Sequence, residues 1–496
     1  MSISRMDLSR RTFLKQTATA ASGLAIAFYL PCGLSATDPK APTPASDFEP
    51  NAWVRILPDG TVKLVVHKHD SGTGTHTALA ACVAEELDVN PMSVQVISPE
   101  NPFFETYIHP IWKVFSTGGS TSVSLEYERL RMAGATARTL LLTAAARQWK
   151  VSADTCTTEE GRVVHAATQR SLGYGELAVV AAHLPAPTKV TLKDPAQFKY
   201  IGKLRHKRDA QAKVCGRFTY SIDVVLPDML VAVIQRAPVV GASVVSVDST
   251  AALQVPGVRK VIKVPGRPDV LGGNVAGVAV LADHYWAAHQ GRALLEVQWS
   301  DSPLAGFDSD ELHKAQAAAL ADEGAQRVRA MAAGDVSGQW PNAAKLFEAE
   351  YRMPYKVQNP LEPICITAQV KDNAITYWGG VQVPSSALEA AKTVCKIVQD
   401  KVTIHELVSG GSFGAREAKY WLFEVAYLAQ QTRVPVKLMN SREDEMRSLF
   451  MHPATLHRAK GALDAQGHLT ALQLEAVSPA SPEQWEPGYF ERPDKK

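Results

Sequence analysis

The chain has 496 residues, a formal net charge of +2 at pH 7 and a hydrophobic fraction of 46%. These values describe an ordinary globular protein of about two to four domains, and they exclude the strongly basic surface typical of nucleic-acid binding. The six cysteines include no C-x-x-C pair, which argues against an iron–sulfur cluster, a c-type haem or a zinc ribbon in this chain. If the protein transfers electrons, another subunit must carry them away.

Residues 1–36 have the pattern of a twin-arginine export signal. Arg10 and Arg11 lie in the run Ser-Arg-Arg-Thr-Phe-Leu-Lys, and a short, alanine-rich apolar run covers 18–30. That run is too short to predict a membrane-spanning helix. The alternative interpretation is a basic amphipathic start to the protein. We expect export of a folded protein to the periplasm, in solution or against the cytoplasmic membrane, and a proline-rich linker over 37–50.

Residues 51–200 are predicted to form the first folded segment. Two apolar strands, 54–57 and 62–66, flank a Pro-Asp-Gly turn and predict a β-hairpin. The chain then passes through a polar turn into a helix that ends near Leu87.

Two histidines and two glycines lie between that hairpin and that helix. His67 and His69 fall on one face of the predicted strand, but no third ligand stands at a suitable spacing, so a metal site is the weaker interpretation. Gly72 and Gly74 favour a tight turn whose backbone a ligand can approach closely.

A second glycine turn covers 117–123 and has the sequence Thr-Gly-Gly-Ser-Thr-Ser-Val. A long helix toward Ala146 follows it. Hydroxyl groups at the start of a helix are most often caps. The alternative is that these hydroxyls and the adjacent N–H groups bind a phosphate.

Residues 201–300 change to short strands separated by turns, which predicts a small domain of its own. The predicted elements are strands at 218–223, 230–234, 244–247 and 275–281, with helices at 251–253 and from 282. Residues 301–342 are polar and alanine-rich, and we expect a connector that is partly helical. Residues 343–496 form the last predicted domain.

The last domain contains the most informative stretch of the chain, Gly410 to Arg416. A predicted strand, 402–408, leads into it, and an amphipathic pattern over 422–429 predicts the helix that follows. Strand, glycine turn and helix start suit an anionic ligand, because the N–H groups of a first helical turn point outward. A purely structural turn remains the alternative. The other predicted elements are a turn carrying Gln382, a strand at 434–439 and a hairpin over 457–476.

The run Gly-Gly-Ser-Phe-Gly-Ala-Arg at 410–416 resembles the glycine-rich loop beside the molybdenum in the xanthine dehydrogenase and aldehyde oxidase family. From residue 51 to about 476, the chain most resembles the large, molybdopterin-binding subunit of the isoquinoline 1-oxidoreductase type. The turn at 117–123, with the run Leu-Arg-Met-Ala-Gly-Ala-Thr-Ala-Arg at 130–138, is close to the pattern of that type. The resemblance implies a mixed α/β (α+β) fold, namely a molybdopterin-binding domain with an inserted a/b hammerhead domain at 201–300.

The resemblance also implies a cofactor of molybdenum and molybdopterin, as the cytosine dinucleotide. Gln382 would hydrogen-bond an oxygen or sulfur ligand of molybdenum, and it is the one catalytic residue implied; no residue is implied as a direct metal ligand. Thr73 stands where the family has a glutamine that contacts the pterin. The cofactor-binding residues implied are Gly72, Gly74, Gly118, Gly119, Ser120, Thr121, Ser122, Gln382, Gly410, Gly411, Ser412, Phe413, Gly414 and Arg416.

The chemistry implied is hydroxylation of an aldehyde or an N-heterocycle with water as the oxygen source. Electrons would pass to a [2Fe–2S] small subunit and then to a cytochrome c or a quinone. The family's Gly-x-Gly-Glu segment, whose glutamate is the general base, has no match in this chain. We therefore expect a second chain to supply a missing C-terminal region. The alternative is a non-catalytic truncated remnant or a cofactor- or partner-binding module.

Overall fold

The computed structural model describes residues 24–27, 52–99, 102–267, 274–302, 304–447 and 451–479. The chain forms two compact units. Unit 1 comprises the residues up to Val224 together with 373–392 and 397–410, and unit 2 comprises the remainder. The predicted export signal and linker lie outside the described residues, apart from strand β1. None of the described helices is long and apolar enough to cross a bilayer.

Unit 1 begins with a four-stranded sheet in the order β1-β2-β3-β4. Its strands are β1 (Leu24–Ala27), β2 (Ala52–Ile56), β3 (Val62–Val65) and β4 (Gln95–Ile97). β2 pairs antiparallel with β1 and with β3, and β3 pairs parallel with β4. The predicted hairpin is therefore confirmed as β2–β3.

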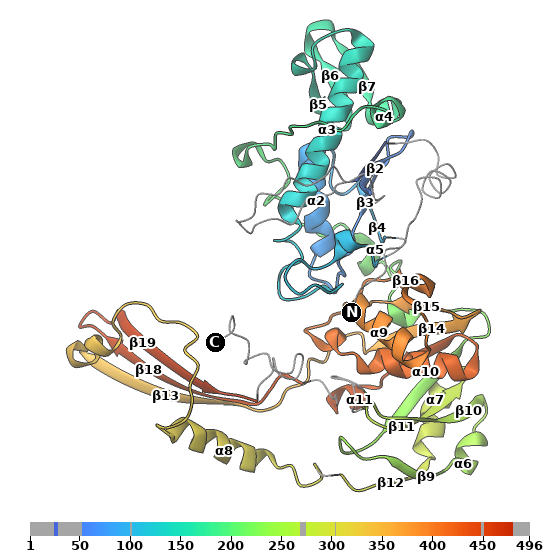
Figure 1. The fold of residues 1–496 in the computed structure, drawn as a ribbon, viewed down its shortest axis with the longest axis vertical. Coiled ribbons are helices and arrows are strands. Elements are labelled where there is room, and N and C mark those ends of the chain that lie inside the picture. Colours follow the sequence, from blue (N-terminus) through green and yellow to red (C-terminus); the bar gives the residue numbers. More distant parts are fainter. Residues whose placement is uncertain are drawn as a thin grey trace, which may run out of the picture. The chain divides into compact units, whose positions relative to one another are not determined.

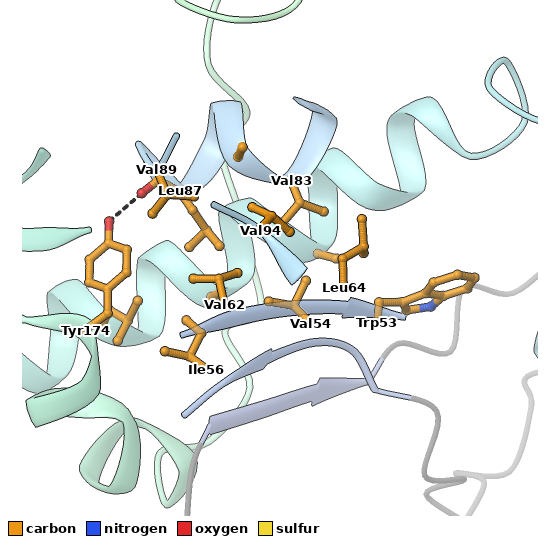
Figure 2. Close-up of a cluster of buried hydrophobic side chains, with 14 of the residues drawn as sticks. Trp53, Val54, Ile56, Val62, Leu64, Val83, Leu87, Val89, Val94 and Tyr174 are labelled. Carbon is orange, nitrogen blue, oxygen red and sulfur yellow. Dashed lines mark hydrogen bonds between the residues drawn. The ribbon is translucent and has the colours of Figure 1, made fainter. Parts of the chain in front are cut away.

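Two helices pack against this sheet and close the hydrophobic core (Figure 2). They are α2 (Thr75–Leu87) and α3 (Tyr127–Trp149). The helices approach closely at Gly134 of α3, where a Cβ would come within 2.8 Å of the Val83 carbonyl oxygen. Tyr174 joins the core from the next part of the chain, and its hydroxyl donates to the Leu87 carbonyl (2.5 Å).

Buried ion pairs also connect these two helices. Glu86 on α2 is fully buried and accepts from Arg131 (2.9 Å) and Arg138 (2.9 Å) on α3. A buried carboxylate is tolerated only when such donors satisfy it. The hydrophobic pattern alone did not predict this contact.

The rest of unit 1 is a small antiparallel sheet, β5-β6-β7, and a second group of elements after residue 373. β15 and β16 pair in parallel. These elements are β5 (Thr157–Glu159), β6 (Arg162–His165), β7 (Arg170–Gly173), α4 (Tyr174–Ala182), α5 (Ala210–Val214), β15 (Ala374–Gly379), α9 (Pro384–Val394, the last two residues of which belong to unit 2) and β16 (Val402–Glu406).

Unit 2 contains the strand series β10-β11-β8-β17-β14. The series is antiparallel except for the parallel pair β8–β17. The strands of the series are β8 (Leu230–Arg236), β10 (Val258–Val264), β11 (Gly277–Ala282), β14 (Cys365–Lys371) and β17 (Val436–Met439). A separate two-stranded sheet consists of β9 (Val244–Asp248) and β12 (Glu296–Trp299). The helices are α6 (Thr250–Leu253), α7 (Tyr285–Ala293), α10 (Tyr420–Thr432) and α11 (Arg442–Met446).

A second sheet of unit 2 has the order β13-β18-β19, with long antiparallel strands (Figure 1). Its strands are β13 (Lys345–Met353), β18 (Thr455–Leu463) and β19 (Leu469–Val477), and α8 (Ser309–Ala321) packs against it. The helix expected within 301–342 and the final hairpin are thus confirmed. The short 3-10 helices are η1 (Glu105–Tyr107), η2 (Ala153–Thr155), η3 (Ala166–Thr168), η4 (Pro195–Gln197), η5 (Ser221–Asp223), η6 (Ser337–Asn342), η7 (Gln399–Lys401) and η8 (Ala415–Glu417).

The predicted mixed α/β class is confirmed, and most of the predicted strands and helices are present. The strand predicted at 218–223 is wrong, because this stretch contains η5. The Asp223 carboxylate accepts the Tyr220 N–H (2.9 Å), so a local side-chain bond competes successfully with a strand.

Candidate functional site

The Gly72–Gly74 turn of unit 1 bends through left-handed backbone, with φ of +88° and +83° at its two glycines. The geometry predicted for them is confirmed. The buried carboxylate of Asp70 accepts the N–H groups of Gly72 (2.8 Å), Gly74 (3.3 Å) and His76 (3.1 Å). Burial alone would raise the pKa of Asp70, but these donors outweigh it and hold the pKa below its usual value. Thus a side chain of the protein already holds the N–H groups of the two glycines.

The two histidines before this turn have separate partners. β3 ends at Val65, so the prediction that His67 and His69 lie on a strand is wrong. His67 stacks on Tyr107 at 4.7 Å, whereas His69 hydrogen-bonds through Nδ1 to the Glu406 carboxylate. Within the described ranges, no group of three His, Cys, Asp or Glu side chains could hold a metal ion.

The second glycine turn is a partly exposed loop that precedes α3. Gly119 and Ser120 both have left-handed φ values, +57° and +56°. The Thr121 hydroxyl donates to the Gly118 carbonyl (2.8 Å) and is hydrogen-bonded to His109 Nε2 (2.9 Å). The expected role of its hydroxyls as a helix cap is wrong, because α3 begins only at Tyr127 and has no side-chain cap.

Several N–H groups of this loop have no acceptor among the described parts of the protein. They belong to Gly119, Ser120 and Ser122. Because Gly119 and Ser120 are exposed and Ser122 is half-buried, these groups can meet a ligand that accepts hydrogen bonds.

Gln382 lies in the turn between β15 and α9. Its side chain is buried, and its amide nitrogen donates to the Thr117 carbonyl (2.8 Å). In return, the Thr117 N–H donates to the Gln382 carbonyl (2.9 Å). The structure therefore brings Gln382 against the start of the second glycine turn. Its role toward a molybdenum ligand stays a prediction.

The first turn also contacts the start of the 410–416 loop within unit 1. The Ser409 N–H donates to the Asp70 carbonyl at 3.1 Å, one residue before Gly410. Unit 1 therefore joins Gly72, Gly74, the 118–122 loop, Gln382 and Gly410, while the residues from Gly411 to Arg416 belong to unit 2.

In unit 2, the buried side chain of Arg416 stabilises the Gly411–Gly414 loop. The Arg416 guanidinium is 1% exposed and donates to the Gly411 carbonyl (2.8 Å) and the Glu362 carboxylate (2.9 Å). α10 begins at Tyr420, after η8. The expectation that the loop leads directly into the first turn of this helix is therefore wrong.

Phe413 and Gly414 are the open part of this loop. Both have left-handed φ values, +53° and +93°, and the Phe413 side chain is 68% exposed. Their two N–H groups have no acceptor within the described residues. A Cβ built on Gly414 would meet no atom within 4 Å, so the loop leaves room beside its backbone.

Sequence reasoning missed the carboxylates that hold these loops: Asp70, Glu362 and Glu406. For Asp70 a local signal exists, because an Asp two residues before a glycine commonly accepts the N–H group of that glycine. Glu362 and Glu406 meet partners far away in sequence, and the local pattern contains no sign of that pairing.

Comparisons with known proteins show which family this chain is similar to. Two family models, each described as a molybdopterin cofactor-binding domain, match residues 4–229 and 320–492. Isoquinoline 1-oxidoreductase subunit beta of Brevundimonas diminuta is 30% identical over 97% of this chain and 66% of its own length. Membrane-bound aldehyde dehydrogenase (pyrroloquinoline-quinone) of Gluconacetobacter polyoxogenes is 26% identical over 95% of this chain and 60% of its own length.

Among solved structures, quinoline 2-oxidoreductase from Pseudomonas putida 86 is 20% identical, with a TM-score of 0.41 over 54% of this chain and 38% of its own. The chain thus spans 66% or less of the length of these relatives.

Proposed function

Because the chain belongs to the molybdopterin-binding subunits of the xanthine oxidase family, we propose that it is the large-subunit component of a molybdenum hydroxylase. The proposed reaction oxidises an aldehyde or an N-heterocycle with water as the oxygen source. The observation that carries the proposal is a set of loop N–H groups that have no acceptor within the described residues, namely those of Gly119, Ser120, Ser122, Phe413 and Gly414.

The residues of the chain fit the cofactor that this family binds. Phosphate and pterin groups accept hydrogen bonds, and the open N–H groups of Phe413 and Gly414 supply donors without a bulky side chain at Gly414. When bound, the molybdenum cofactor supplies the two-electron oxidation of the substrate carbon. Gln382 and the Phe413 and Gly414 amides would orient it.

Two buried glutamates are already committed to structural contacts. Glu362 pairs with Arg416 (2.9 Å), and Glu445 accepts from Asn440 (2.7 Å) and the Ile364 N–H (3.2 Å). We therefore do not assign the general base to either. We expect it to come from the further sequence that the longer relatives contain.

The β13–β18–β19 sheet supports the proposal that the protein works with a partner. Phe347, Tyr351 and Met353 of β13 and Leu472 and Leu474 of β19 share one face by register, and all are at least 37% exposed. Exposed apolar patches of this kind mark interaction surfaces. We propose that polypeptide equivalent to the remaining length of the relatives covers this face, in this chain or in a second one. A separate [2Fe–2S] subunit would receive the electrons and pass them to a cytochrome c or a quinone.

We further propose that the protein is exported by the twin-arginine route, which carries folded proteins and so suits a cofactor inserted before export. The dense motif around Arg10 and Arg11 supports this proposal. Replacement of both arginines by lysine should leave the protein in the cytoplasm. Unchanged delivery to the periplasm would contradict the idea.

The main test is the composition of the purified protein. The full chain, isolated with its co-purifying polypeptides, should contain molybdenum, a pterin and cytidine monophosphate after hydrolysis. It should also reduce a dye in the presence of an aldehyde or an N-heterocycle, and the preferred series would identify the substrate class. Absence of pterin from the complex would favour the non-catalytic alternative.

A matched pair of variants tests the loop itself. Gly414→Val and Gly467→Val both place a branched residue at a left-handed φ, +93° and +84°, with no atom within 4 Å of the new Cβ. Gly467 lies in the β18–β19 turn, away from the loop. Both should lose similar stability, while pterin content should fall only in Gly414→Val. Equal pterin content in the two variants would show that the loop is only a turn.

A further inference from the structure

A closed set of hydrogen bonds in unit 1 connects Gln382 to the pair formed by His69 and Glu406. The His69 N–H donates to the Thr117 hydroxyl at 2.9 Å, and its ring Nδ1 is bonded to the Glu406 carboxylate. That carboxylate also accepts the Val381 N–H at 3.2 Å. These contacts join the segment before the first glycine turn to the end of β16 and to the turn after β15.

The set closes through Gln382 itself. Thr117 and Gln382 exchange two bonds: the Gln382 amide nitrogen donates to the Thr117 carbonyl (2.8 Å), and the Thr117 N–H donates to the Gln382 carbonyl (2.9 Å). His69, Glu406, Val381, Gln382 and Thr117 therefore form one ring, which we call the Gln382 ring. Movement of one member must strain or break bonds of the others.

The donors of this ring determine the role of the Glu406 carboxylate. The Val381 N–H can only donate, so the Glu406 oxygen that it reaches must accept. A carboxylate accepts from His69 as well when Nδ1 carries the hydrogen. The side chains are 2% exposed for His69 and 17% exposed for Glu406, so their hydrogen bond is shielded from water. His69 also lines a cavity of about 20 Å³, which is room for one water.

We propose that His69 and Glu406 are positioning residues, which fix the turn that carries Gln382 and so determine how the chain holds and uses its cofactor. This inference rests on the proposed function. The pair acts through the backbone of Val381 and the side chain of Thr117, which lie on either side of Gln382. Partners of this kind, one contact removed from a cofactor-binding side chain, commonly change affinity or activity on the order of tenfold when they are lost.

Two kinds of variant test the Gln382 ring: one kind breaks its hydrogen bonds, and the other keeps them. His69→Leu and Glu406→Leu remove the bond between the two side chains. His69→Asn keeps an N–H donor near the position of Nδ1, and Glu406→Gln keeps an acceptor for the Val381 N–H. Glu86→Leu is the matched control, because Glu86 is another glutamate of unit 1 whose carboxylate accepts hydrogen bonds. Among the described residues, its donors are Arg131, Arg138 and the Lys193 N–H, outside the Gln382 ring.

The measurements on the full chain with its partners are pterin per chain, the rate of pterin release after dilution, and turnover per bound molybdenum. The two Leu variants of the ring should release pterin on the order of tenfold faster and turn over on the order of tenfold more slowly per molybdenum. The two conservative variants should stay within about threefold of the wild type. Glu86→Leu should lower the folded fraction but leave turnover per molybdenum unchanged.

A double variant tests whether the pair works as one unit. His69→Leu with Glu406→Leu should be no worse than Glu406→Leu alone. Glu406→Leu already loses the bonds to His69 and to the Val381 N–H, so the second change breaks no further bond of the ring. Wild-type pterin release and turnover per molybdenum in the Leu variants, or losses that simply multiply, would overturn the proposal. If the Leu variants do not fold, a tenfold loss in both conservative variants would also contradict it, since these keep the bonds. A wild-type protein without pterin would instead refute the proposed function.

Discussion

The Gly72–Gly74 turn of unit 1 and the Gly411–Gly414 loop of unit 2 both bend through left-handed glycines, but groups of opposite charge hold them. In the first, the Asp70 carboxylate gathers three N–H groups. In the second, the Arg416 guanidinium donates to the Gly411 carbonyl and pairs with Glu362. An anion therefore organises donors in one case, and a cation organises acceptors in the other.

This difference separates a turn that is complete in itself from a loop that is open to a ligand. Asp70 already occupies the position that an anionic ligand would take in the first turn. Arg416 leaves the Phe413 and Gly414 N–H groups without an acceptor among the described residues. Glycine-rich sequence alone looks the same in both places, so the side chain that holds the turn decides whether its donors are available.

The largest expected effect on stability comes from removal of the Arg416 cation, which holds the Gly411–Gly414 loop. Arg416→Met leaves the Glu362 carboxylate buried without its partner, which typically costs about 3–5 kcal/mol of unfolding free energy. Denaturant unfolding of the full chain measures this cost. The double change Arg416→Met with Glu362→Gln should recover part of it. A Met variant as stable as the wild type would show that the pair does not hold the loop.

Loss of the anion in the first turn should cost less. Asp70→Asn keeps the size of the side chain but turns an NH₂ group or a weaker acceptor toward three N–H donors, so we expect a loss of about 2 kcal/mol. Pterin content should stay close to the wild type where the protein remains folded, because this turn's donors face Asp70. Loss of pterin without loss of stability would mean that the first turn binds the cofactor directly.

Acid should affect the two regions differently. The pKa of Asp70 is lowered in the folded protein, so its contribution to stability is present above its unfolded pKa of about 3.9 and is lost as the pH falls below that value. Arg416 does not change its charge in this range. The urea midpoint of the wild type should therefore fall more steeply below about pH 4 than that of Asp70→Asn. Parallel curves would contradict the assigned role of Asp70.

The smallest expected effect is that of Gly72→Ala. Its φ of +88° disfavours any Cβ, but no atom lies within 4 Å of the new group, so the cost is about 1 kcal/mol. Thermal unfolding measures this loss, and pterin content should be unchanged. Gly414→Ala, at φ +93°, should cost about the same but lower the pterin content.

A local pattern was enough for much of the fold. The β2–β3 hairpin, α2 and the β18–β19 hairpin follow from periodicity and turn residues that neighbours in sequence supply. The stretch at 218–223 looked like a strand, yet Asp223 bonds to the Tyr220 N–H and forms η5. At this stretch, the hydrogen bond of one side chain, Asp223, overrides the strand propensity of the sequence.

The sequence by itself determined the family, the mixed α/β class and the glycine turns at 72–74 and 410–416, because each depends on local composition or a contiguous motif. Only the tertiary structure decided which turn keeps its donors free. It also paired His69 with Glu406, 337 residues apart, and Arg416 with Glu362. Contacts of this kind depend on how distant segments pack, and no local period or spacing specifies them.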